Sequence, residues 1–245
     1  MVDLNIILPN SWQELSQKQL RYIYTMIALG LSVDEVKTYC LFHWSKIKIL
    51  HRYGDNGYMC KLKKKRFIIT AEEVAAAIGF LDWMRQLPTL PVRLEKIGRH
   101  RAAPADLQGL ALETFIICDN LYQGYLSTQK EELLDEMAEH LYGTKHLDAA
   151  ERINIFYWFA SVKAMLAREF SNFFQPMQND SSNMIDNEKS QYEILKAAVN
   201  AQIRALTKGD VTKEKEVLAM DTWRALTELD AQAREYEELR KQYPH

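Results

Sequence analysis

The chain repeats one helix-start signal, in which a Ser or Thr is followed three residues later by Glu or Gln. Such a capping box satisfies two backbone N–H groups that the first helical turn leaves unpaired. Copies of the pattern begin at Ser11, Ser16, Ser32, Thr70 and Thr128, and most of them stand directly before apolar residues at helical spacing. The 245 residues include only 9 Gly and 6 Pro, too few for a loop-rich sandwich. The sequence therefore predicts a mainly α protein.

The expected organisation is a multi-helix bundle over residues 1–175, a linker at 176–190 and a C-terminal helical hairpin at 191–245. Residues 176–190 are polar and bury too little apolar surface to offset the entropy lost on ordering. In the last predicted helix, over 212–242, four residues recur in steps of three and four, as in a narrow helix-pairing seam. These are Leu226, Leu229, Ala233 and Tyr236, and they suggest self-association through the hairpin.

One segment, residues 46–69, breaks the helical rhythm. Apolar and basic residues alternate there with a period of two on both sides of a strong turn signal, Gly54-Asp55-Asn56-Gly57. We therefore expect a single β-hairpin inside the helical body. In its second strand the same period would place Lys61, Lys63 and Lys65 on one face.

The predicted hairpin is strongly basic. Residues 1–70 contain 11 Lys/Arg against 5 Asp/Glu, whereas the formal charge of the whole chain is −2. Between 46 and 66 only Asp55 opposes eight cations, which are the candidate contacts for phosphate or an acidic partner: Lys46, Lys48, Arg52, Lys61, Lys63, Lys64, Lys65 and Arg66.

Three interpretations of the basic hairpin remain open. Two helices joined through Gly30 precede it, which is the order of a winged-helix DNA-binding protein with the hairpin as its wing. Lysines on an edge strand also deter sheet-to-sheet aggregation. The third possibility is that the hairpin docks on an acidic protein surface.

Motifs for chemistry are sparse. Cys40, His43, His51 and Cys60 are conceivable zinc ligands, but only the first two form a close pair, and structural zinc sites commonly use two. The nucleophile-elbow, phosphate-loop, dinucleotide and zinc-protease patterns are missing from the sequence. We expect a non-enzymatic protein with no cofactor, metal or catalytic residue, and an unrecognised hydrolase is a remote alternative.

The number of cysteines and the character of the N-terminal residues both favour a cytoplasmic location. Three Cys at wide spacing do not form a disulfide framework. No secretory signal is seen at the N-terminus, and the longest apolar stretch, 153–162, is about half the ~20 residues of a membrane span. The expected location is the cytoplasm.

Two terminal motifs carry a resemblance. Leu8-Pro-Asn-Ser-Trp-Gln-Glu-Leu-Ser-Gln-Lys-Gln-Leu20 resembles the start of small proteins from phage and prophage morphogenesis clusters. Residues 203–218 and 221–229 are similar to the end of uncharacterised prophage proteins from gut bacteria. The resemblance implies a tail-assembly-chaperone-like role in the cytoplasm of a bacterial host, with other phage-like assembly proteins as partners. It implies no site residues, and a DNA-binding protein of a mobile element is the rival.

Overall fold

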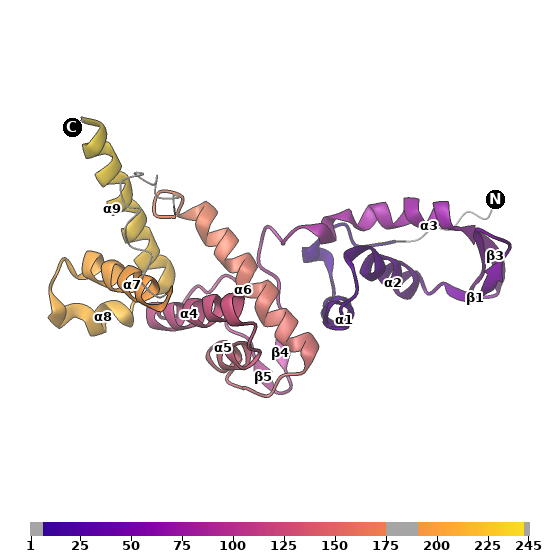
Figure 1. Ribbon diagram of the computed structural model, residues 1–245, viewed down its shortest axis with the longest axis horizontal. Helices are drawn as coiled ribbons and strands as arrows, with labels where there is room; N and C mark the ends of the chain where they lie inside the picture. The colour runs from indigo at the N-terminus through magenta and orange to yellow at the C-terminus, as the bar shows by residue number, and fades with distance from the viewer. Residues whose placement is uncertain (1–6, 175–190, 243–245) are drawn as a thin grey trace.

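The protein is elongated, with a small β-sheet at one end and the C-terminal helices at the other (Figure 1). The computed structural model describes residues 7–174 and 191–242, and side chains are described up to 174 and from 199 onward. The predicted linker at 176–190 lies outside the described residues.

The N-terminal half begins with η1 (Trp12–Glu14), α1 (Gln17–Ala28) and α2 (Val33–Ser45), and continues after the sheet with α3 (Ala71–Ile78) and η2 (Gly79–Arg85). The capping boxes predicted at Ser16, Ser32 and Thr70 are confirmed, each with both hydrogen bonds present. The boxes predicted at Ser11 and Thr128 are wrong. Ser11 makes no side-chain capping hydrogen bond, and Thr128 is the last residue of a helix, while the next helix has no side-chain cap.

These elements enclose the N-terminal core, which is built around two tryptophans and the inner faces of α1 and α2. Trp12 and Trp83 meet edge to face with ring centroids 5.3 Å apart, and each indole N–H donates to a backbone carbonyl. The buried members are Trp12, Leu20, Ile23, Tyr24, Val36, Cys40, Leu41, Leu81, Met84, Leu94 and Ala150.

The C-terminal half is also helical. It contains a two-residue-strand hairpin, β4 (Lys96–Ile97) and β5 (His100–Arg101), and the helices α4 (Leu112–Thr128), α5 (Glu132–Tyr142), α6 (Ala149–Glu169), α7 (Gln191–Thr207), α8 (Glu214–Leu218) and α9 (Thr222–Gln242), with η3 (Val211–Lys213) before α8. The mainly α fold class is thus confirmed. Among the described residues, no helix has both the length and the apolar character needed to cross a membrane.

The helix predicted over 212–242 is interrupted between α8 and α9. Residues 219–221 leave the helix and pair with the segment before α4, where the N–H of Leu112 donates to the carbonyl of Met220 at 2.8 Å. Asp221 Oδ2 accepts from the N–H of Gly109, and its Oδ1 accepts from the N–H of Arg224 in the first turn of α9. Asp221 therefore caps α9 and fixes it to α4.

As a result, α8 and α9 share one apolar core with α4, α5 and α6. Val217, Ala225, Leu226 and Leu229 are buried in this C-terminal core together with Trp158 and Phe159 of α6. Along the described chain, the residues of the N-terminal core give way to those of the C-terminal core near residues 94–97. The described helices from 191 onward pack on the helices before them and form no separate core.

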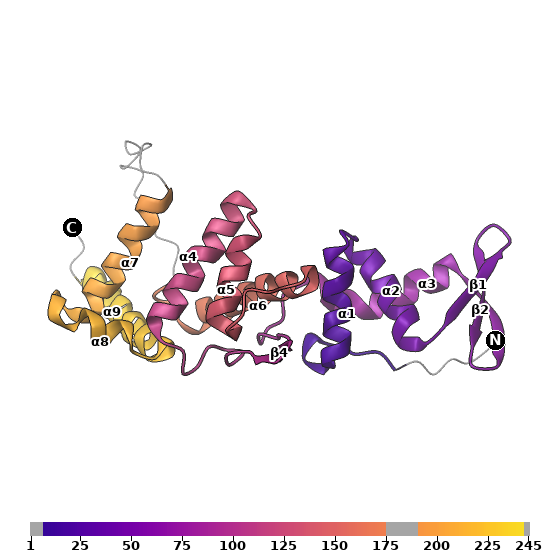
Figure 2. The same ribbon diagram turned by 90° about the horizontal axis from the view of Figure 1, so that it is seen from below.

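Helix α6 joins the two halves (Figure 2). Its first turns pack on α1, with Ala150 in the N-terminal core, and its middle and last turns fill the C-terminal core. At the changeover, Asn154 is fully buried. Its Oδ1 accepts from the N–H of Leu94 at 2.8 Å, and its Nδ2 donates to the hydroxyl of Tyr142, which donates to the carbonyl of Leu94.

The sheet has three antiparallel strands in the order β1-β2-β3, formed by β1 (Lys48–Tyr53), β2 (Gly57–Leu62) and β3 (Lys65–Thr70). The predicted hairpin is present, but the third strand was not predicted, because Lys63 and Lys64 form a second turn. Lys63 has φ +54°, a left-handed conformation that Gly or Asn usually provides. Ile47 and Cys60 are buried at the sheet, yet they belong to neither core.

The packing of α9 predicts that substitutions at the buried and exposed ends of the helix-pairing seam change the stability of the fold by different amounts. We expect Leu229→Ala to lower the free energy of unfolding by about 2–5 kcal/mol, because it leaves a cavity in the C-terminal core. The control Tyr236→Ala, at a side chain that is 68% exposed, should change it by less than about 0.5 kcal/mol. Urea unfolding of both variants measures this. Equal, small effects would show that α9 does not belong to that core.

Candidate functional site

The sheet gathers the eight predicted basic residues at one end of the molecule. Lys46 ends α2 in a left-handed conformation, and the other seven lie on β1, β2, β3 or the turn between β2 and β3. All eight side chains are exposed.

Three of these cations form a row across the strands. The register places Lys48 opposite Lys61, and Lys61 opposite Arg66. Residues directly opposite in antiparallel strands point to the same face, and neighbouring strands are about 4.8 Å apart, so three positive charges lie within roughly 10 Å. We call Lys48, Lys61 and Arg66 the cation row.

The expected grouping of Lys61, Lys63 and Lys65 on one face is therefore wrong. Lys63 lies in the turn, and Lys65 stands opposite Leu62, one position away from the Lys61–Arg66 pair. Because side chains alternate between faces, Lys65 points to the other face from the cation row.

The cation row has no counter-ion in the described part of the chain. No salt bridge involves any of the eight predicted cations, and only Arg52 makes a side-chain hydrogen bond, from Nη2 to the carbonyl of Asp55 at 2.6 Å. Like charges directly opposite each other destabilise a sheet. The row therefore carries a positive charge that the described residues leave unneutralised.

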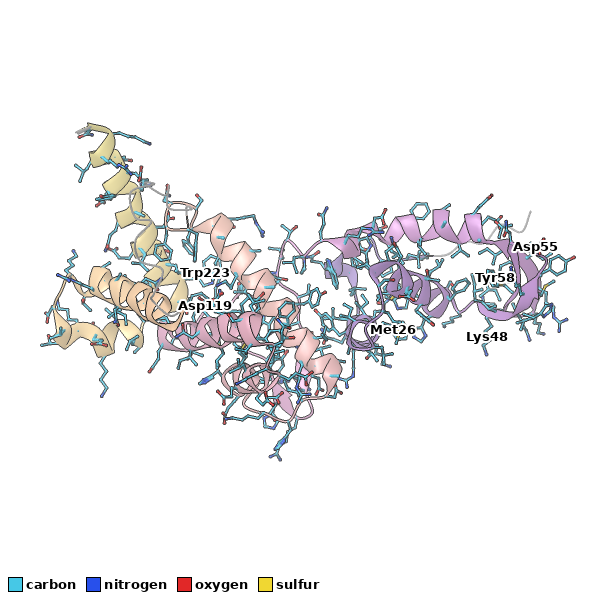
Figure 3. All side chains as sticks on the ribbon, in the orientation of Figure 1. Met26, Lys48, Asp55, Tyr58, Asp119 and Trp223 are labelled. Atoms are coloured by element: carbon cyan, nitrogen blue, oxygen red, sulfur yellow. The ribbon has the colours of Figure 1, made fainter. Side chains whose placement is uncertain are left out.

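Charge is polarised along the sheet. Lys48 and Asp55 lie at opposite ends, with Tyr58 between them (Figure 3). Asp55 is in the β1–β2 turn, next to the start of α3, where Glu72 and Glu73 follow Thr70. The positive end is therefore the one that carries the β2–β3 turn.

An apolar hollow lies beside this positive end, between the exposed face of α2 and the start of β1. Tyr39 and Ile49, about half exposed, form much of its wall. We call it the α2–β1 hollow; its volume is about 600 Å³ and its lining is Asp34, Glu35, Thr38, Tyr39, Phe42, Ile47 and Ile49.

The α2–β1 hollow was not predicted from the sequence. Tyr39 lies at helical spacing from the buried Val36, but its own side chain is about half exposed. A usable signal is the run Lys46-Ile47-Lys48-Ile49, whose period of two assigns isoleucines and lysines to opposite sides.

The order of α1, α2 and the strands is that of a winged-helix protein. The exposed face of α2, however, is unsuitable for binding DNA. That face lines the hollow and presents Asp34 and Glu35 with apolar side chains. A recognition helix contacts phosphates and base edges, so carboxylates at its start would be repelled.

An ion-pair cluster holds α2 against η2. Nζ of Lys37, a side chain that is 2% exposed, lies 2.9 Å from Asp34 Oδ1 and 2.6 Å from Asp82 Oδ1, and Arg85 also contacts Asp34. The hydrogen bond from Lys37 lowers the pKa of both carboxyls. Burial disfavours the charge on Lys37, but its hydrogen bonds to the two carboxylates outweigh this effect and raise its pKa.

The four conceivable zinc ligands are not brought together. Cys40 is buried in the N-terminal core, where burial raises the pKa of its thiol to about 12. His43 stacks on Tyr22, with centroids 4.1 Å apart, while His51 and Cys60 lie on the sheet. Within residues 7–174 and 191–242, no group of three or more His, Cys, Asp or Glu side chains is placed to hold a metal ion.

The predicted helix-pairing seam is divided between interior and surface. Leu226 and Leu229 are buried in the C-terminal core, Ala233 is partly buried, and Tyr236 is exposed together with Leu239. Of the seam residues, only Tyr236 in the last turns of α9 is exposed for contact with another molecule.

A smaller cavity of about 140 Å³ lies between α4, α6, α7 and α9. Its wall includes an ion pair between Asp119 and Lys163, and Asn120, whose buried Oδ1 has no hydrogen-bond partner among the described residues. A water molecule would satisfy that oxygen, so the cavity by itself indicates no particular ligand.

Comparison with known proteins finds no matching protein family, no matching curated protein and no matching solved structure.

The ion-pair cluster predicts a specific pH dependence of stability. Asp34 and Asp82 have lowered pKa values in the folded state, so they stabilise it above the ordinary carboxyl pKa of about 3.9, and this contribution is lost as the pH falls. In Lys37→Met the pKa values of Asp34 and Asp82 rise toward the ordinary carboxyl value, because the hydrogen bond from Lys37 is lost. The loss of stability between about pH 6 and pH 3 should therefore be smaller in this variant.

Urea midpoints across this pH range provide the measurement. Lys61→Met is the matched control, since Lys61 has no carboxylate partner in the described structure, and it should follow the wild-type protein. A wild-type pH profile in Lys37→Met would exclude the cluster as a source of acid sensitivity.

Proposed function

We propose that this chain is a non-enzymatic binding protein that holds an acidic partner protein through its N-terminal sheet. The observation that carries the proposal is the cation row of Lys48, Lys61 and Arg66, unneutralised in the described structure, on a sheet outside both apolar cores. Like charges directly opposite each other destabilise a sheet, and an acidic partner would compensate this repulsion.

Exposed apolar side chains on the same sheet favour a protein partner. Ile49, Leu50 and Tyr53 are each between 43% and 51% exposed, and the apolar α2–β1 hollow adjoins the positive end. Protein interfaces combine an apolar centre with a polar rim, whereas binding to a phosphate backbone needs mainly cations.

The biological setting in this proposal comes from the two terminal motifs. Their resemblance to phage and prophage morphogenesis proteins supports a tail-assembly-chaperone-like role in the cytoplasm of a bacterial host. The partner would then be a subunit that must be held before it polymerises, and the exposed end of α9 provides a second contact surface for a partner or another copy.

The test uses the full chain co-expressed with the genes that flank its own. The test variant carries Lys48→Glu, Lys61→Glu and Arg66→Glu, the three residues of the cation row. The matched control carries Lys96→Glu, Arg99→Glu and Arg101→Glu on the β4–β5 hairpin, where Lys96 likewise pairs with Arg101 across two strands.

We expect the wild-type chain and the control to copurify with one flanking-gene product, free of nucleic acid. The test variant should bind it at least about tenfold more weakly, and the wild-type affinity should fall with salt. Copurification with DNA or RNA alone, a lone monomer, or equal losses in both variants would contradict the proposal. A steep salt dependence of duplex binding that the test variant abolishes would favour the DNA-binding alternative.

A further inference from the structure

The start of β1 has an apolar surface on one face of the sheet and a positive surface on the other. Ile47 and Ile49 line the α2–β1 hollow, while Lys48, between them in sequence, points to the opposite face with Lys61 and Arg66. A segment lying alongside would therefore meet an apolar surface with every second residue and a positive surface with the others.

The backbone of β1 is also open on one side. Strand β1 is at an edge of the sheet, and no backbone hydrogen bond joins residues 48–53 to any described residue outside the sheet. An edge strand with exposed apolar side chains, such as Ile49 and Leu50, is a template for pairing with another chain.

The regular part of this edge is short. The pairing of β1 with β2 shifts register between Ile49 and His51, which leaves Leu50 as a bulge. A bulge bends an edge strand and stops continuous pairing. Strand addition is thus confined to the residues before Leu50, next to the hollow and the cation row.

We propose that the start of β1 binds an extended segment of a partner protein in which acidic and large apolar residues alternate. The segment adds a strand beside Lys48 and Ile49, its carboxylates meet the cation row, and its apolar side chains enter the α2–β1 hollow. This inference rests on the proposed function, because it gives the acidic partner a defined binding mode and sequence pattern.

Charge separates this occupant from the other candidates. A second copy of the chain would bring its own basic sheet against Lys46 and Lys48, so edge-to-edge pairing of two copies is opposed by repulsion. A nucleic acid would neutralise the cation row, but it has no peptide N–H and C=O groups to continue the sheet. An acidic, alternating peptide continues the sheet with its backbone and turns only its apolar side chains toward the hollow. Its carboxylates then face the cation row, on the side opposite Asp34 and Glu35.

The probe is an N-acetylated, C-amidated octapeptide in which glutamate alternates with valine. It is titrated into the full-length protein at low salt, and binding is followed by calorimetry and by amide hydrogen exchange of fragments covering residues 46–53. A second peptide has the same side chains but N-methyl groups at alternate positions, so it cannot donate along one edge. A 12-base-pair DNA duplex serves as the polyanion comparison.

We expect the first peptide to bind and to slow amide exchange at residues 48–49. The N-methylated peptide should bind at least about tenfold more weakly, since it retains only the charge and side-chain contacts. Ile49→Ser should weaken the first peptide by about tenfold. The control Ile68→Ser, on β3 at similar exposure (44% against 49%), should leave its affinity unchanged.

Several results would overturn the inference. These are equal affinity for the two peptides, no protection at residues 48–49, equal losses in the two serine variants, DNA binding that slows exchange at the same amides, or dimerisation through β1 without peptide. Failure here is distinct from failure of the proposed function. If the natural partner needs the cation row but tolerates Ile49→Ser, only the strand-addition mode is wrong.

Discussion

The arrangement of the molecule depends on the buried hydrogen bonds of Asn154. Its side chain joins α6 to the backbone of Leu94, where the N-terminal half ends, and to Tyr142 at the end of α5. A buried amide is costly unless it is paired, so the chain must bring these three segments together in one geometry. The ion pairs of Arg21 with Asp148 and Glu151 hold α1 beside the start of the same helix.

Local signals predict most of the helices, and long-range contacts explain what they miss. The capping boxes at Ser16, Ser32 and Thr70 work because all their partners lie within four residues. The interruption between α8 and α9 depends instead on Asp221 meeting Gly109, more than a hundred residues away in sequence. The second turn of the sheet was missed because Lys63 and Lys64 are not typical turn residues, and the strand pairing imposes their conformation.

The residues of the candidate site could be predicted from the sequence, but their arrangement in space could not. Counting charges is enough to find the basic segment, and an alternating pattern is enough to predict a strand. The opposition of Lys48, Lys61 and Arg66 requires the register of three strands, which a one-residue shift would change completely. The α2–β1 hollow depends on which face of α2 is left uncovered. That choice is made by α1 and η2 packing on its other face, and it leaves no trace in the local pattern around Tyr39.

Helix α6 has a mechanical consequence. It is one continuous helix of 21 residues, about 30 Å long at 1.5 Å per residue, and its two ends are embedded in different cores. Because both cores are fixed on the same helix, the N-terminal helices and the buried first turns of α9 are kept at a set separation. Two molecules bound to the two halves would therefore be held at a defined separation, and the protein would set their effective concentration relative to each other.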